Sequence, residues 1–155
     1  MELILWRHAE AEPGTLELPD AQRALTPKGQ RHAARMGAWL EHKLPPECRI
    51  LVSPATRCVQ TADALGRRYK VVDALGTEST ADAIIAACGW PEHRQPVLVV
   101  GHQPLLGEVA SLVLCGQQQA WRIRKAGVFW IAHKESDGLP YIRLVAGPDV
   151  IGKLR

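Results

Sequence analysis

Residues 96–102 read Pro-Val-Leu-Val-Val-Gly-His, and this stretch decides the class of fold. Its apolar side chains follow one another without alternating with polar ones, which is typical of a strand buried on both faces of a parallel sheet. Similar short apolar runs at 2–6, 49–53 and 69–72 predict three more strands. Because both faces of such a sheet must be covered, we expect an α/β protein.

Helical segments are predicted between these strands. Thr26-Pro27 is an N-cap followed by proline at the first helical position, and it begins a helix that runs from Lys28 to about His42. Further helices are expected over 55–68, from 79 or 80 to 88, and over 104–114. Strands and helices therefore alternate, which predicts a three-layer α/β/α sandwich with a mostly parallel central sheet and right-handed crossovers.

The last third of the chain follows a different pattern. Segments 127–133 and 139–145, separated by a turn at 135–138, predict a hairpin added at an edge of the sheet. Segment 10–25 is rich in proline, glycine and acidic residues, so we expect a loop at the rim of a site. No repeat or linker divides the 155 residues, so a single domain over 1–155 is expected.

Composition and charge exclude several classes of function. A hydrophobic fraction of 46% is ordinary for a soluble protein, and no apolar run approaches the ~20 residues that span a membrane. The net charge of +3, without a cluster of lysine and arginine, gives little support for nucleic-acid binding. The four cysteines form no C-x-x-C pair, and the N-terminus does not resemble a signal peptide, so a cytoplasmic protein with free thiols is expected.

Side chains suited to phosphate chemistry lie at the ends of three predicted strands. Arg7 and His8 follow the first strand, Arg57 begins the helix after the second, and His102 follows the fourth. Each of them alone has an ordinary interpretation, as a solvated strand end, a helix residue or a loop histidine. Because the carboxyl ends of parallel strands meet at one edge of a sheet, we expect these four side chains to converge. Guanidinium groups bind phosphate oxygens, and imidazole can attack phosphorus or shuttle protons.

Four short motifs, in this order, resemble those of the histidine phosphatase superfamily. They are Arg7-His8-Ala9-Glu10, the L-T-P-K-G segment at 25–29, the S-P-A-T-R-C-V-Q-T-A segment at 53–62 and the V-V-G-H-Q-P segment at 99–104. The short length and the His-x-Pro sequence are most similar to the SixA-type phosphohistidine phosphatases of that superfamily. The resemblance covers most of the chain and implies a phosphoglycerate mutase-like fold.

The resemblance also implies a role for each of the four residues. His8 is the expected nucleophile, which would form a phosphohistidine intermediate that water then hydrolyses. Arg7, Arg57 and His102 would bind the phosphoryl oxygens. The second ring N–H of His8 needs an acceptor, which the sequence does not identify. No metal or other cofactor is expected, because four donors already neutralise the phosphate and no Asp/Glu cluster is typical of a metal site.

The nature of the substrate depends on a proton donor. Cleavage of a phosphate ester requires a general acid, whereas the imidazole that leaves from phosphohistidine can already carry a proton. Glu78 is a candidate general acid, Asp73 a weaker one, and Asp20 in the long first loop another. Glu78 is equally typical of a helix N-terminus, and Asp20 of a solvated turn.

We therefore expect a metal-independent phosphatase for phosphohistidine in a phosphorylated protein, such as a phosphorelay or phosphocarrier protein. Its product would be inorganic phosphate, and a monomer without membrane or nucleic-acid partners is expected. Two alternatives stay open, which are a phosphatase of small phosphate monoesters and a non-catalytic phosphoprotein-binding module. The presence of His8 argues against the binding module. Lys125, before the predicted hairpin, could contact phosphate from the edge of the pocket, but a solvated lysine at the start of a strand is the favoured interpretation.

Overall fold

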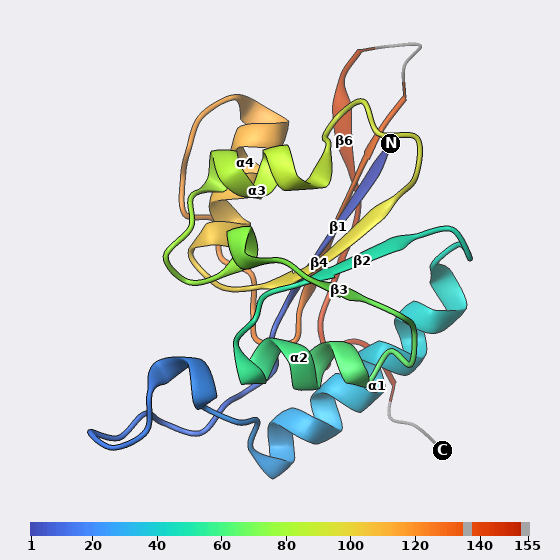
Figure 1. Cartoon of the computed structure of the whole chain (residues 1–155). Helices are drawn as coiled ribbons and strands as arrows, with labels where there is room; N and C mark the ends of the chain where they lie inside the picture. The colour runs from blue at the N-terminus through green and yellow to red at the C-terminus, as the bar shows by residue number, and fades with distance from the viewer. Residues whose placement is uncertain (135–137, 153–155) are drawn as a thin grey trace.

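A six-stranded sheet forms the centre of the molecule, in a computed structural model that describes residues 1–134 and 138–152. The strand order is β3-β2-β4-β1-β5-β6 (Figure 1). The strands are β1 (Glu2–Arg7), β2 (Arg49–Val52), β3 (Lys70–Val71), β4 (Val97–Gly101), β5 (Val128–His133) and β6 (Pro140–Ala146). The first four strands pair in parallel, whereas β5 and β6 are antiparallel. The predicted parallel sheet and its C-terminal hairpin at an edge are confirmed.

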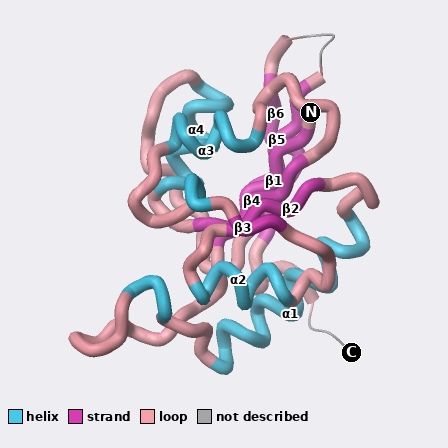
Figure 2. The backbone as a smooth tube through the Cα atoms, viewed as in Figure 1, coloured by secondary structure: helices cyan, strands magenta, loops and turns pink. Residues whose placement is uncertain are grey.

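Helices cover both faces of this sheet (Figure 2). They are α1 (Pro27–Lys43), α2 (Thr56–Asp63), α3 (Ala81–Cys88) and α4 (Leu105–Cys115), with short 3-10 helices η1 (Asp20–Gln22) and η2 (Asp73–Leu75). In β1, Ile4 and Trp6 point into the core formed with α1 and α2, and Leu3 and Leu5 into the core formed with α3 and α4. The predicted three-layer α/β/α sandwich is thereby confirmed.

Helix α1 begins where the sequence predicts it. The Thr26 side chain accepts a hydrogen bond from the backbone N–H of Gly29 at 2.9 Å, as expected of an N-cap. Gly29 also lies against the preceding loop, since a Cβ at this position would approach the carbonyl oxygen of Glu10 to 2.0 Å. The L-T-P-K-G segment therefore joins the start of α1 to the chain that follows β1.

Helix α2 is shorter than the predicted helix over 55–68. It ends at Asp63, and Gly66 adopts a left-handed conformation with φ of 75°. The turn brings Arg67 to α1, where its guanidinium pairs with the Glu41 carboxylate at 2.7 Å. Arg67 also donates to the backbone carbonyls of Leu44 and Pro45, directly after α1, so the chain beyond α2 is held against α1.

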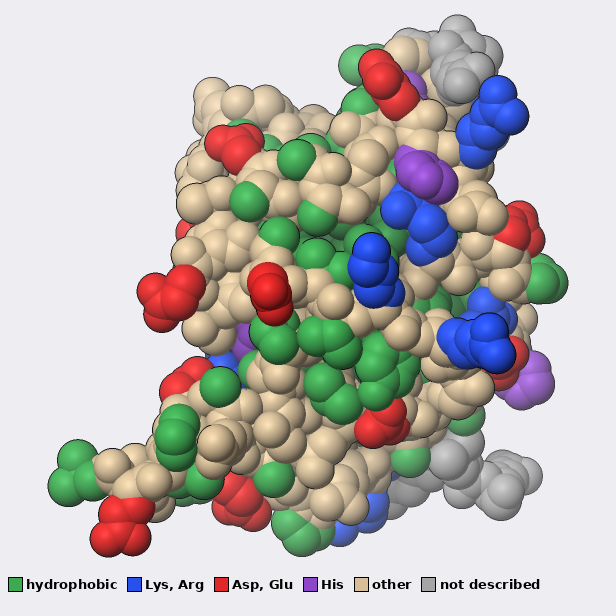
Figure 3. All heavy atoms as spheres, in the orientation of Figure 1, with side chains coloured by type: hydrophobic (Ala, Val, Ile, Leu, Met, Phe, Trp, Pro, Cys, Tyr) green, Lys and Arg blue, Asp and Glu red, His purple; other side chains and the backbone are tan. Residues whose placement is uncertain are grey.

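The two irregular segments of interest lie at opposite ends of the sequence. Segment 10–25 is a loop, as predicted, apart from η1 and an isolated bridge between Ala11 and Leu25. In Figure 3 its tip stands clear of the body of the molecule, with Leu16 fully exposed. The predicted hairpin turn at 135–138 falls largely outside the described residues. Within the described part of the chain, no helix combines the length and apolar character needed to cross a membrane.

Candidate active site

The register of the sheet brings the three predicted strand ends level. Arg7 lies opposite Gly101 in the β1–β4 pairing, and Val52 lies opposite Val100 in the β2–β4 pairing. The backbone N–H of His8 then donates to Gly101 at 3.1 Å, and that of Ser53 donates to Val100 at 3.0 Å. As a result, the residues that follow β1, β2 and β4 emerge side by side at the carboxyl edge of the sheet.

His8 is held by a hydrogen bond to its own strand end. Its Nδ1 lies 2.7 Å from the carbonyl oxygen of Ala9. Because a carbonyl can only accept, Nδ1 carries the proton and Nε2 keeps its lone pair. Burial, followed by the influence of neighbouring ionisable groups, lowers the pKa of His8 to about 3, against an opposing effect of the Ala9 bond. The ring is therefore neutral at neutral pH, and Ala9 is the acceptor that the sequence did not identify.

His102 lies beside His8, with 5.4 Å between the ring centroids. Its Nε2 is 2.8 Å from the hydroxyl Oγ of Ser53, and both side chains are buried. Burial and the nearby Arg57 cation lower the pKa of His102 to about 4. His102 is consequently neutral as well, and Ser53 fixes the orientation of its ring.

Arg57 is buried at the start of α2, where the sequence predicts it to face the site. One guanidinium nitrogen, Nη2, lies 3.4 Å from Nδ1 of His102. The same nitrogen is 3.0 Å from the Asp20 carboxylate, and Nη1 donates to the Asp20 carbonyl at 2.8 Å. Asp20 also pairs with Arg23, and these hydrogen bonds to Arg23 and Arg57 lower the pKa of the Asp20 carboxyl. The long first loop thus places an ionised carboxylate on the arginine expected to bind phosphate.

Arg7 reaches the site from the end of β1. Its Nη1 donates to the backbone carbonyl of Ile123 at 3.0 Å, which holds the guanidinium against the segment before β5. Burial and the neighbouring Arg122 cation lower the pKa of Arg7. Within the described residues, the buried Nε atoms of both Arg7 and Arg57 have no hydrogen-bond partner. Buried donors without a partner are uncommon in proteins. The cluster of Arg7, His8, Arg57 and His102 therefore has more hydrogen-bond donors than acceptors.

Two residues of the 53–62 motif have positioning contacts that the sequence analysis did not assign. The Thr61 hydroxyl donates to the Arg57 carbonyl at 2.7 Å and accepts from the backbone N–H of Ala9 at 3.1 Å. Gln60 accepts from the backbone N–H of Leu25 at 2.7 Å. Helix α2 is thereby joined to the chain on both sides of the first loop. The presence of Gln60 and Thr61 in the motif was the one signal in the sequence that they matter to the site. A polar residue in a predicted helix does not reveal which group it contacts.

Two cavities flank this cluster. One, of about 510 Å³, is lined by Asp20 and Ser53 together with the segment 73–79. Both candidate general acids, Glu78 and Asp20, and the weaker candidate Asp73 line it. The other, of about 480 Å³, includes Arg7 in its lining. Across residues 1–134 and 138–152, no group of three or more His, Cys, Asp or Glu side chains is placed to hold a metal ion.

Comparison with known proteins agrees with this geometry. A model of the histidine phosphatase superfamily (branch 1) matches residues 3–79. An uncharacterised protein of Picosynechococcus sp. is 31% identical over 139 residues, which are 83% of this chain and 82% of that protein. The phosphohistidine phosphatase SixA of Escherichia coli is 28% identical over 131 residues, or 76% of each protein.

The likeness extends to three dimensions. A structure of the protein histidine phosphatase SixA complexed with tungstate superposes with a TM-score of 0.81 and 25% sequence identity, covering 96% of this chain and 98% of that one. These similarities agree with the order of the four motifs and with their positions at the strand ends. The chain belongs to the histidine phosphatase superfamily and is a member of its SixA-type branch.

Proposed function

We propose that this protein removes the phosphoryl group from phosphohistidine in a protein substrate, without a metal ion, through a phosphoryl group carried on His8. The hydrogen bond from His8 Nδ1 to the Ala9 carbonyl is the observation that supports this most strongly. It commits the proton to Nδ1 and leaves the Nε2 lone pair free to attack phosphorus. A depressed pKa of about 3 keeps this nucleophile unprotonated over the physiological range.

The reaction takes place in two transfers. In the first, a bond forms between Nε2 of His8 and phosphorus while the bond from phosphorus to the substrate nitrogen breaks. The substrate ring leaves as neutral imidazole when its other nitrogen carries a proton. In the second, water attacks the phosphorus on His8, the new P–N bond breaks and returns its electron pair to Nε2, and inorganic phosphate leaves with the protons of the water.

Three neighbouring side chains stabilise the charge on the transferred group. Arg7 and Arg57 supply guanidinium donors, and His102 supplies a ring N–H. Contacts of this kind are each typically worth about 2.7–4 kcal/mol in the transition state. The buried Nε atoms of Arg7 and Arg57 have no acceptor within the described residues, so both remain able to donate to an anion.

The substrate class is proposed from the leaving group and from the relatives. Imidazole leaves phosphohistidine without needing a buried carboxylic acid, and Asp20 is held ionised beside Arg57. The similarity to proteins named phosphohistidine phosphatase supports the same choice. The partner would be a phosphorylated protein of a phosphorelay or phosphocarrier system.

A second candidate function is hydrolysis of small phosphate monoesters. It is favoured by the cavity of about 510 Å³ beside Ser53, whose lining includes the Glu78 carboxylate. A glutamic acid in this position could protonate the alkoxide that leaves from an ester.

One experiment separates these functions. The protein is incubated in parallel with a phosphohistidine protein, a phosphoserine peptide and a sugar phosphate, each with and without EDTA. We expect the highest kcat/KM on phosphohistidine, unchanged by EDTA, and loss of turnover in His8→Ala. Faster turnover of the sugar phosphate would favour the ester phosphatase. Loss of activity in EDTA would contradict the metal-independent mechanism, and a fully active His8→Ala variant would contradict the covalent one.

A further inference from the structure

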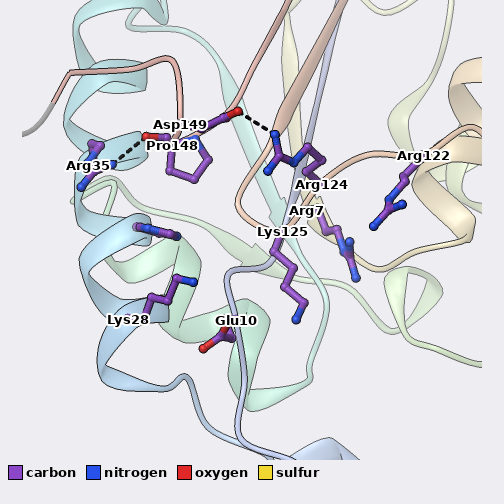
Figure 4. A pocket seen from close by; sticks show the side chains of 10 residues that line it. Arg7, Glu10, Lys28, Arg35, Arg122, Arg124, Lys125, Pro148 and Asp149 are labelled. Carbon is purple, nitrogen blue, oxygen red and sulfur yellow. Dashed lines mark hydrogen bonds and ion pairs between the residues drawn. The ribbon is translucent and has the colours of Figure 1, made fainter.

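A second cavity, of about 480 Å³, opens beside Arg7 on the side of the site away from Glu78. Four parts of the chain form it, namely the end of β1 with the residues after it, the first turns of α1, the segment 122–125 before β5, and the turn at 148–149 after β6 (Figure 4). Its basic lining residues are Arg7, Lys28, His32, Arg35, Arg122, Arg124 and Lys125. Arg7 also belongs to the phosphate cluster, so the cavity borders the candidate active site at this residue.

Most of this positive charge is not neutralised. Of the two acidic lining residues, Asp149 pairs with Arg124 at 2.6 Å, and Glu10 accepts from the Thr26 hydroxyl at 3.0 Å. Among the described residues, no carboxylate lies within ion-pair distance of Lys28, Arg122 or Lys125. All three side chains are exposed. Burial and, secondarily, the Arg122 cation lower the pKa of the neighbouring Arg7.

The lining also indicates what kind of group the cavity accepts. Pro148 is its one apolar member, and apart from the His32 ring it offers no aromatic surface on which a base could stack. Long, exposed lysine and arginine side chains adapt to several negative groups without enclosing any of them. These properties suit carboxylates on the surface of a large partner better than a small molecule held in a closed pocket.

We propose that this cavity, here called the basic subsite, binds acidic side chains that lie beside the phosphohistidine on the protein substrate. The inference rests on the proposed function, because the partner is taken to be the molecule that presents its phosphoryl group to His8. Carboxylates near the phosphohistidine would contact Lys28, Arg122 and Lys125 while the phosphoryl group contacts Arg7. The basic subsite thereby selects phosphohistidine proteins whose modified histidine has acidic neighbours.

The test uses two synthetic phosphohistidine peptides of equal length. One has Asp and Glu flanking the phosphohistidine, and the other has Asn and Gln in the same places. For the unmodified protein, we expect kcat/KM to be higher on the acidic peptide, by about two- to fivefold for each cation engaged. The preference should shrink as salt rises through 0.15 M, where the screening length is about 8 Å.

Charge removal provides the matched comparison. Lys28→Gln, Arg122→Gln and Lys125→Gln, combined in one protein, should abolish the preference and leave turnover of the neutral peptide unchanged. Lys43→Gln, at the far end of α1, makes the same chemical change outside the cavity and should retain it. Circular dichroism confirms that the triple variant is folded.

A binding measurement keeps this inference separate from the proposed function. Calorimetry with His8→Ala, which lacks the nucleophile, should give a lower Kd for the acidic peptide. Preferential binding of that peptide without hydrolysis by the unmodified protein would retain the basic subsite and reject the proposed function. Equal binding and equal hydrolysis of the two peptides would overturn the basic subsite alone. So would a triple variant that loses affinity for tripolyphosphate but keeps its peptide preference, because the cavity would then be a site for small polyanions.

Discussion

The Ser53 hydroxyl contacts Nε2 of His102 at 2.8 Å in the buried layer beneath the candidate active site. Ser53 Oγ also accepts from the backbone N–H of Ala55 at 3.3 Å, so its own proton is available for the histidine. Donation to Nε2 leaves the ring proton on Nδ1, the nitrogen that faces the guanidinium of Arg57. Because a guanidinium only donates, this Nδ1–H would serve a phosphoryl oxygen bound beside Arg57 in the proposed function, and Ser53 orients the ring for that contact.

Replacement of Ser53 tests this arrangement. Ser53→Ala should lower kcat by roughly 10- to 100-fold, because a buried hydrogen-bond partner left unsatisfied costs about 1–3 kcal/mol. Steady-state kinetics on the phosphohistidine substrate measure the effect. Ser111→Ala removes another buried serine, in α4, and should lower stability without changing kcat. Equal kcat values for Ser53→Ala and the unmodified protein would contradict an orienting role.

The contact between Asp20 and Arg57 predicts competition with phosphate. A phosphoryl group that binds Arg57 as proposed would compete with the Asp20 carboxylate, which is exposed and 3.0 Å from the guanidinium. Asp20→Asn should therefore let inorganic phosphate inhibit at an about two- to fivefold lower concentration, as for other exposed ion pairs. Inhibition constants for phosphate provide the measurement.

The Asp20→Asn variant also tests whether Asp20 is the general acid. If this carboxyl were the general acid, Asp20→Asn would lower kcat on phosphate esters and leave phosphate inhibition unchanged. Glu17→Gln, in the same loop, is the control, since Glu17 makes no ion pair among the described residues. Glu17→Gln should alter neither kcat on phosphate esters nor the inhibition constant for phosphate.

Substitution of Glu78 separates the two substrate classes. Glu78→Gln should leave hydrolysis of phosphohistidine within about threefold of normal, and should lower any ester hydrolysis by about 10²- to 10⁴-fold if this residue is the acid for esters. Parallel assays on the two substrates measure the difference. Asp82→Asn, in the first turn of α3 and outside the cavity lining, is the matched control. A large loss on phosphohistidine in Glu78→Gln would show that imidazole release also requires an acid.

The two depressed histidine pKa values predict a pH dependence of stability. In the folded protein the pKa of His8 is lowered to about 3 and that of His102 to about 4, whereas the pKa of an unfolded histidine is near 6.5. Above pH 6.5 neither state binds these protons. Below it the unfolded state binds them first, so the free energy of unfolding should fall as pH decreases from about 6.5 toward 4, by up to about 1.4 kcal/mol per unit for each histidine.

Urea denaturation at pH 7 and pH 5 measures this loss of stability. Proton NMR of the folded protein provides the independent check, because the ring signals of His8 and His102 should not shift over that interval. Ring signals that titrate with a midpoint near 6.5 would contradict the buried, neutral state of both histidines.

Much of the fold could be predicted because its signals are local. The unbroken apolar run at 97–100 requires burial on both faces, and Thr26 with Pro27 begins a helix wherever it lies. The end of α2 could not be predicted in this way. The helix ends before the left-handed turn at Gly66, and this turn lets Arg67 reach Glu41, a contact between segments distant in sequence.

The sequence by itself determined which residues meet at the site, since Arg7, His8, Arg57 and His102 lie at the ends of strands or the start of a helix that the fold must bring together. The tertiary structure alone decided how they are held. His8 is hydrogen-bonded to the Ala9 carbonyl, His102 to Ser53, and Arg57 to Asp20. These hydrogen bonds depend on distances and directions that the residue types alone do not specify. The basic subsite depends on tertiary structure for the same reason. Lys28, Arg122 and Lys125 are ordinary surface cations in sequence, and only the fold places α1 and the segment before β5 around one cavity beside Arg7.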